Sequence, residues 1–124
     1  MTIEALSYLN DCFESLSIPY EFMQWTKDLS FPYFIGEYTE VEPLDEDGKE
    51  EGTLILTGTT DKSYMTLESI KESLKQFFPS HGRTAILDSG SGIAVSFSNA
   101  FPVPTGVQGL VRIQINLNIQ EWRN

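Results

Sequence analysis

The clearest pattern lies near the end of the chain, where apolar and polar residues alternate strictly from Val111 onward. One set of positions carries Val111, Ile113, Ile115, Leu117 and Ile119, and the other carries Arg112, Gln114, Asn116, Asn118 and Gln120. A period of two predicts a strand with one buried face and one solvated face. Such a strand is on the order of 35–40 Å long. We therefore expect it either to bend or to protrude and offer an edge to another chain.

Two other segments carry apolar residues at spacings of three and four, which predicts amphipathic helices. The first covers residues 3–16, with Thr2 as a candidate N-cap and Pro19 beyond its end. The second covers residues 63–78 and stops at Pro79. We expect each helix to bury one apolar stripe.

Short runs rich in aromatic and β-branched residues predict the remaining strands. They cover residues 20–25, 32–41, 54–60, 84–87 and 93–97. Gly36 lies inside the second of these runs and indicates a bulge or a close backbone approach. Phe101–Gly106 is too rich in proline for a central strand, so we expect a stiff surface loop there.

The resulting order is α-β-β-β-α-β-β-β. Because most strands follow one another through hairpins, we predict one α+β domain covering residues 1–124. It should have a largely antiparallel sheet of about six strands, with both helices packed on one face. A length of 124 residues, with 40% hydrophobic and 21% charged residues, is ordinary for such a domain.

The chain is strongly acidic, with 18 acidic and 8 basic residues and a formal net charge of −10. Nucleic acids and anionic membranes are bound by clustered Lys and Arg, so we expect neither specific nucleic-acid binding nor membrane binding. The acidity is compatible with basic partners, with a surface that DNA passes without sticking, or with solubility alone.

The chain has a single cysteine, Cys12, which cannot form an internal disulfide. A cytoplasmic origin is therefore the default expectation. We expect Cys12 to be a small apolar residue that is buried or half-buried. No basic region precedes an apolar stretch at the start, so we expect no signal peptide.

Candidate chemistry is sparse. His81 is the only histidine, and a nucleophilic site would have to combine it with Cys12 or a serine. One His and one Cys are also too few for a typical zinc site, which takes four Cys, His or carboxylate ligands. We therefore predict a protein without enzymatic activity, metal or cofactor, and keep an enzyme built on His81 and Cys12 as an alternative.

Two glycine-containing segments resemble ligand loops only superficially. Aligning Gly48 with the glycine of a calcium loop puts Pro43 and Leu54 at the two end ligands, and neither supplies a side-chain oxygen. The run Ser89–Gly92 precedes a predicted strand, whereas phosphate cradling needs a helix N-terminus. A solvated acidic turn and a hairpin turn explain these segments better.

Two loops are the candidate contact regions, since recognition residues are found on loops more often than on packed strands. They are the acidic loop at residues 45–51 and the proline-stiffened loop at 101–109; plain surface loops are the alternative. The predicted interface residues are Asp45, Glu46, Asp47, Glu50, Glu51, Phe101, Val103, Arg112, Gln114 and Asn116.

Aromatic residues gather between positions 22 and 38. They are Phe22, Trp25, Phe31, Tyr33, Phe34 and Tyr38. Stacking of nucleic-acid bases on such residues comes with a basic groove, and here the flanking residues are acidic. Core packing is the better interpretation, with an exposed subset as interface anchors.

Several segments together resemble small structural proteins of tailed bacteriophages and prophages of Gram-positive bacteria. The segments are Tyr20–Trp25, Phe31–Tyr38, Leu54–Gly58, Asp88–Ala94, Asn99–Gly106 and Arg112–Leu117. Within that group the chain is most similar to tail terminator or tail-completion proteins, which act at the joint between head and tail. The resemblance covers nearly the whole chain and is one of overall pattern, without a diagnostic motif.

This resemblance implies a small α+β fold without enzymatic activity. It also implies a homo-oligomeric ring, typically a hexamer, that caps the tail tube and in some cases closes only on the tail. The implied partners are tail-tube and head-connector proteins, in the host cytoplasm during assembly and then in the tail or neck of the virion. Acidic subunits around a lumen would repel DNA phosphates and let the genome slide.

A binding protein of another class is the main alternative. An acidic module that mimics DNA and inhibits a nucleic-acid enzyme suits the net charge. Dense rows of helical carboxylates, which would favour that role, do not occur in the sequence.

Overall fold

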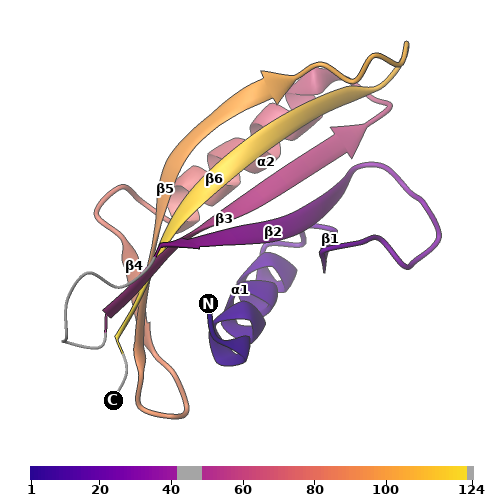
Figure 1. Ribbon diagram of the computed structural model, residues 1–124. Helices are drawn as coiled ribbons and strands as arrows, with labels where there is room; N and C mark the ends of the chain where they lie inside the picture. Colours follow the sequence, from indigo (N-terminus) through magenta and orange to yellow (C-terminus); the bar gives the residue numbers. More distant parts are fainter. Residues whose placement is uncertain (42–48, 123–124) are drawn as a thin grey trace.

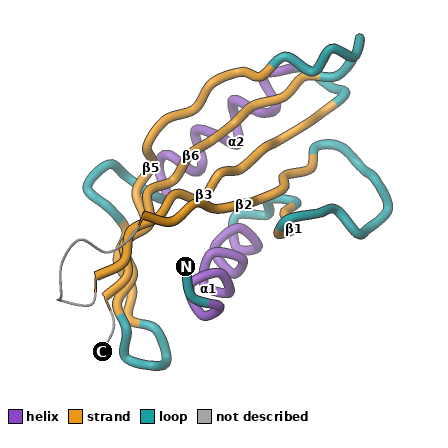
Figure 2. The backbone as a smooth tube through the Cα atoms, in the orientation of Figure 1, coloured by secondary structure: helices purple, strands orange, loops and turns teal. Residues whose placement is uncertain are grey.

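A computed structural model describes residues 1–41 and 49–122 and confirms the predicted order of elements (Figures 1 and 2). The elements are α1 (Ile3–Ser15), β1 (Tyr20–Phe22), β2 (Tyr33–Val41), β3 (Lys49–Thr60), α2 (Tyr64–Phe77), β4 (Arg83–Ile86), β5 (Gly92–Val103) and β6 (Val111–Trp122). Neither helix in this part of the chain is long and apolar enough to cross a membrane.

The strands form a single curled sheet in the order β1-β2-β3-β6-β5-β4 (Figure 1). Every neighbouring pair is antiparallel except β1 and β2, which run parallel. The long loop between these two strands lets the chain return to the same end of the sheet before β2 begins. The predicted, largely antiparallel sheet is therefore confirmed, with one parallel pair at its edge.

One apolar cluster joins both helices to the same face of the sheet. On β6 the alternate residues Ile113, Ile115, Leu117 and Ile119 are buried, as their period of two predicts. They belong to the same cluster as residues of both helices, such as Phe13 on α1. Each such buried side chain contributes about 1.5–3 kcal/mol. This burial leaves the opposite face of the sheet without a helix.

Each helix is capped by the residue that immediately precedes it. The Thr2 hydroxyl accepts a hydrogen bond from the Ala5 N–H at 3.1 Å, and the Ser63 hydroxyl accepts one from the Met65 N–H at 3.2 Å. These bonds satisfy N–H groups that lack a partner within the helix. The end of α1 is followed by Ser17 in a left-handed conformation, which turns the chain toward β1.

The long strand β6 bends and does not protrude (Figure 1). All twelve of its residues pair with β3, and its other edge pairs with β5. The strand is central, so it offers no free edge to another chain. The idea that this strand supplies a ring contact through an exposed edge is wrong, because β3 and β5 pair with its two edges.

The predicted loop at 101–109 is only partly a loop. Phe101–Val103 belong to β5, and the connection to β6 covers residues 104–110. Pro102 is tolerated because β4 pairs only with Gly92–Val95, so Pro102 lies on a part of β5 that has a strand partner on one side alone.

The acidic loop predicted at residues 45–51 ends earlier in the structure than in the prediction. Glu50 and Glu51 belong to β3, because pairing with β6 extends that strand back to Lys49. Asp45, Glu46 and Asp47 lie outside the described residues.

Candidate functional site

The candidate site is the helix-free face of the sheet, built from side chains that alternate with the buried ones. We define it by Tyr33, Ile35, Glu37, Thr39, Thr53, Ile55, Thr57, Thr59, Ala94, Ser96, Asn99, Phe101, Val103, Arg112, Gln114, Asn116, Asn118 and Gln120. These residues come from β2, β3, β6 and β5. Both helices pack on the other face, so this surface is available for contact with another molecule (Figure 2).

Half of the predicted interface residues meet on this face. Phe101 lies directly opposite Gln114, and Val103 lies opposite Arg112 across the β5–β6 pair. Asn116 lies opposite Asn99, just beyond a bulge between Phe97 and Asn99. The extra residue at the bulge keeps Phe101 and Val103 on the same face as the polar residues of β6.

Hydrogen bonds between side chains fix the polar groups in place. The Gln114 Nε2 donates to Asn116 Oδ1 at 3.2 Å, and the Asn116 Nδ2 donates to Asn99 Oδ1 at 2.9 Å. The Arg112 Nε donates to Thr59 Oγ1 at 3.0 Å. Sequence reasoning missed Asn99 and Thr59. The alternation in β6 indicated which of its side chains share the polar face. Their partners on neighbouring strands depend on the register between strands, which the alternation does not give.

The helix-free face is nearly neutral, although the chain carries a net charge of −10. Glu37 and Arg112 are its only charged members. Acidic side chains lie mostly outside this face, for example Glu4 and Asp11 on α1 and Asp61 and Asp88 in loops. Depletion of charge at the centre, with aromatic residues and Arg present, is the composition that marks the core of protein–protein interfaces.

One end of this face carries a small charged and aromatic group. Glu51 forms an ion pair with Lys49 at 3.3 Å, and the Lys49 ammonium lies 5.8 Å from the centre of the Trp122 ring. Glu51 lies opposite Gln120 and so continues the helix-free face. The predicted residue Glu51 thus borders this face, while its neighbour Glu50 points to the helix side.

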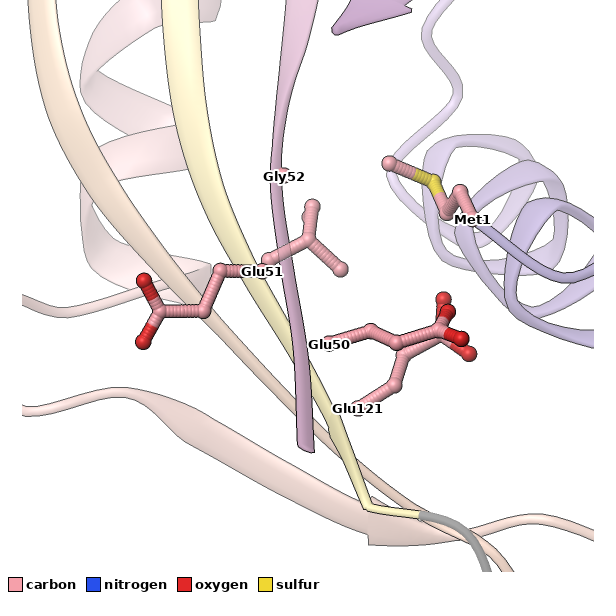
Figure 3. A pocket seen from close by; sticks show the side chains of 6 residues that line it. Met1, Glu50, Glu51, Gly52 and Glu121 are labelled. Carbon is pink, nitrogen blue, oxygen red and sulfur yellow. The ribbon is translucent and has the colours of Figure 1, made fainter. Parts of the chain in front are cut away.

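Glu50 and Glu121 form a separate carboxylate pair beside the start of α1 (Figure 3). Figure 3 shows their side chains pointing the same way, with Glu51 pointing away. Glu121 is 3% exposed and accepts hydrogen bonds from the Thr2 N–H at 3.1 Å and the Thr2 hydroxyl at 2.9 Å. The adjoining cavity of about 10 Å³ has room for about one water molecule. Glu121 thus ties the end of β6 to Thr2, the residue that caps α1.

The residues considered for catalysis do not form an activated pair. His81 is exposed in the turn after α2, and Cys12 is buried in α1. Burial raises the pKa of the Cys12 thiol, whereas a nucleophilic cysteine needs a lowered pKa. Within residues 1–41 and 49–122, no group of three or more His, Cys, Asp and Glu side chains is arranged to hold a metal ion.

The aromatic residues between positions 22 and 38 divide between core and surface. Phe34 is fully buried, while Phe22 is 38% and Tyr38 is 37% exposed, and the rings of Phe22 and Tyr38 stack with centroids 5.9 Å apart. Phe34 therefore packs in the core as predicted, and Phe22 and Tyr38 belong to the exposed subset, whose role as interface anchors stays a prediction.

Comparison with known proteins finds no family model that matches this chain and no similar curated protein.

Proposed function

We propose that this chain is a non-enzymatic assembly protein of a tailed bacteriophage, a tail terminator or head–tail joining component that caps the tail tube as a ring. The observation that carries the proposal is the nearly neutral, hydrogen-bonded, helix-free face, which spans four strands of an otherwise acidic chain. Such a surface suits a broad contact with another protein. The resemblance of the sequence to small phage structural proteins is the reason for proposing a phage assembly protein in particular.

The edges of the sheet provide a second kind of contact for ring formation. β1 and β4 lie at opposite ends of the strand order and are short. Subunits in a ring contact each other through two different surfaces, and these two edges are different surfaces on opposite sides of one sheet. In this proposal the edges join subunits, and the helix-free face contacts the tail tube or the head connector.

The distribution of charge supports the same role. α1 carries Glu4, Asp11 and Glu14 without a basic residue, and it lies on the opposite side of the sheet from the nearly neutral helix-free face. A ring can therefore bind its protein partners through neutral surfaces and keep acidic surfaces for the DNA path. Acidic walls repel phosphates and allow the genome to pass.

A charge placed in the middle of the helix-free face tests the proposed contact. Asn118 is exposed and lies between Ser96 and Thr53 on the neighbouring strands. Burying a lysine there without a partner is costly, so Asn118→Lys should weaken binding to a tail-tube protein from the same genome about tenfold or more. Gln76→Lys adds the same charge at an exposed position on α2 and should leave binding unchanged.

The binding experiment uses native mass spectrometry of the chain alone and with that tail-tube protein. A ring bound to the tube protein, lost in Asn118→Lys and kept in Gln76→Lys, agrees with the proposal. Equal binding by all three proteins contradicts a role for the helix-free face. A monomer that instead binds a nuclease or polymerase tightly would favour the DNA-mimic alternative.

A further inference from the structure

A groove lies at the end of the sheet where β5 turns into β6. It has a volume of about 330 Å³, which falls within the range of small-ligand sites. The residues that matter for its chemistry are Tyr64, Pro102, Val103, Pro104, Leu110 and Arg112. Glu121 lies at the other end of β6 with Glu50 opposite it on β3, so the groove is remote from that carboxylate pair.

Arg112 gives the groove its only charged side chain. Its Nε is held by Thr59 Oγ1 at 3.0 Å, and no carboxylate in residues 1–41 and 49–122 lies within ion-pair distance of the guanidinium. Arg83 likewise has no ion-pair partner among the described residues, but Arg112 is the arginine that lines this groove. The Thr59 bond orients the guanidinium and leaves its terminal nitrogens to bind a carboxylate in a fork geometry.

The rest of the groove is mainly apolar. Pro102, Val103, Pro104 and Leu110 line it, and the Tyr64 ring adds further apolar surface. An apolar side chain placed there loses contact with water, which contributes about 25 cal/mol for each Å² buried. The groove thus combines one cation with a wall suited to an aliphatic group.

The loop beside the groove is held in a defined shape. The Thr105 Oγ1 lies 3.0 Å from both the Val107 and the Leu110 carbonyl oxygens, and the Leu110 N–H donates to the Val107 carbonyl at 3.2 Å. Gly106 and Gly109 have φ angles of 70° and 86°, which glycine adopts without strain. A preformed wall costs little ordering entropy when a ligand binds.

We propose that this groove binds a peptide segment of a partner protein in which an Asp or Glu carboxylate stands next to an apolar side chain. The carboxylate pairs with the Arg112 guanidinium, and the apolar side chain lies against Val103, Leu110 and the prolines. Charge complementarity selects this occupant, because the groove offers a single cation and no anion. The groove can bind such a segment whether or not the chain forms a ring.

The test is a titration of isotope-labelled protein, followed by amide NMR shifts, with two blocked tripeptides. The first is acetyl-Leu-Asp-Leu-amide, and the second replaces Asp with Asn. We expect shifts at Gly106, Val111 and Arg112, with the Asn peptide binding about tenfold more weakly because it loses a charge-assisted hydrogen bond.

Two variants assign the effect to the groove. Arg112→Gln should remove the difference between the two peptides. Arg83→Gln should keep it, since Arg83 lies on β4 with its guanidinium 3.9 Å from the centre of the Phe77 ring. If Arg112→Gln fails to fold, the comparison of the two peptides on the unmodified protein still decides.

Three results would each overturn the proposal: equal affinity for both peptides, shifts that map away from residues 102–112, or no shifts at millimolar peptide. None of these bears on tail-tube binding, which Asn118→Lys tests separately.

Discussion

At the scale of single residues, two aromatic rings rest on glycines of neighbouring strands. The Tyr20 ring lies over Gly36, and the buried Phe34 ring lies over Gly58. A β-carbon at either glycine would overlap the ring above it. The sequence predicts a bulge or a close backbone approach at Gly36, and the structure has instead a close side chain, the Tyr20 ring. The ring responsible could not be predicted, because it depends on the parallel register of β1 against β2.

Gly58→Ala should destabilise the fold by about 1–3 kcal/mol, because the fully buried Phe34 has no room to move aside. Gly92→Ala is the matched control, since its new β-carbon would make only ordinary contacts with Trp122 and Ile86. Urea unfolding measures the free energy of unfolding of both variants and of the unmodified protein. Equal stability of the two variants would show that the Phe34 ring does not confine position 58.

Tyr20 should make stability fall in alkaline solution. Burial raises the pKa of its hydroxyl from 10.0 to about 12, so the folded state holds this proton more tightly than the unfolded state does. The Tyr20 hydroxyl therefore contributes on the order of 2 kcal/mol to the free energy of unfolding. This contribution is fully present below pH 10 and is lost as the pH rises toward about 12.

Tyr20→Phe is the control for this pH dependence, since it keeps the ring over Gly36 and removes the titrating group. Free energies of unfolding measured from pH 9 to 12 should decline less steeply for the variant. Parallel curves for the two proteins would contradict the burial of the hydroxyl.

At the scale of elements, the hydrophobic pattern predicted which segments become helices and strands, but their ends depend on partners. β1 stops at Phe22 because Met23 adopts a φ of 70°, and β3 reaches back to Lys49 because β6 continues to pair with it. The alternation in β6 correctly placed Arg112, Gln114 and Asn116 on one face. The absence of a helix from this face depends on how the helices pack against the sheet, and the local hydrophobic pattern does not predict that packing.

Thr2 joins two elements, since its hydroxyl caps α1 and also donates to the buried Glu121 of β6. Thr2→Ala removes the cap and one partner of a buried carboxylate, so it should cost about 1–3 kcal/mol. Thr2→Ser retains the hydroxyl and should cost far less. Thermal unfolding of both variants, combined with Glu121→Gln in a double-mutant cycle, measures the coupling.

A cycle in which Thr2→Ala and Glu121→Gln act additively would show that the two residues contribute independently. The link between α1 and the end of β6 would then be a matter of packing alone.

At the scale of the whole molecule, the sheet separates two surfaces of different character. One face carries the core and both helices, of which α1 is acidic, and the other is the nearly neutral helix-free face. This division underlies the proposed role, in which protein contacts and the DNA path use different sides. The long strand β6 serves that role as the central strand of the face and does not act as a free edge.

The most direct measurement is deletion of this gene from its source genome, followed by electron microscopy of the induced particles. The account predicts filled heads separated from tails that have abnormal lengths or loose ends. A plasmid copy of the unmodified gene, or of Gln76→Lys, should restore joined particles, whereas Asn118→Lys should not. Normal infectious virions from the deletion strain, or the absence of any phage particles before deletion, would contradict the account.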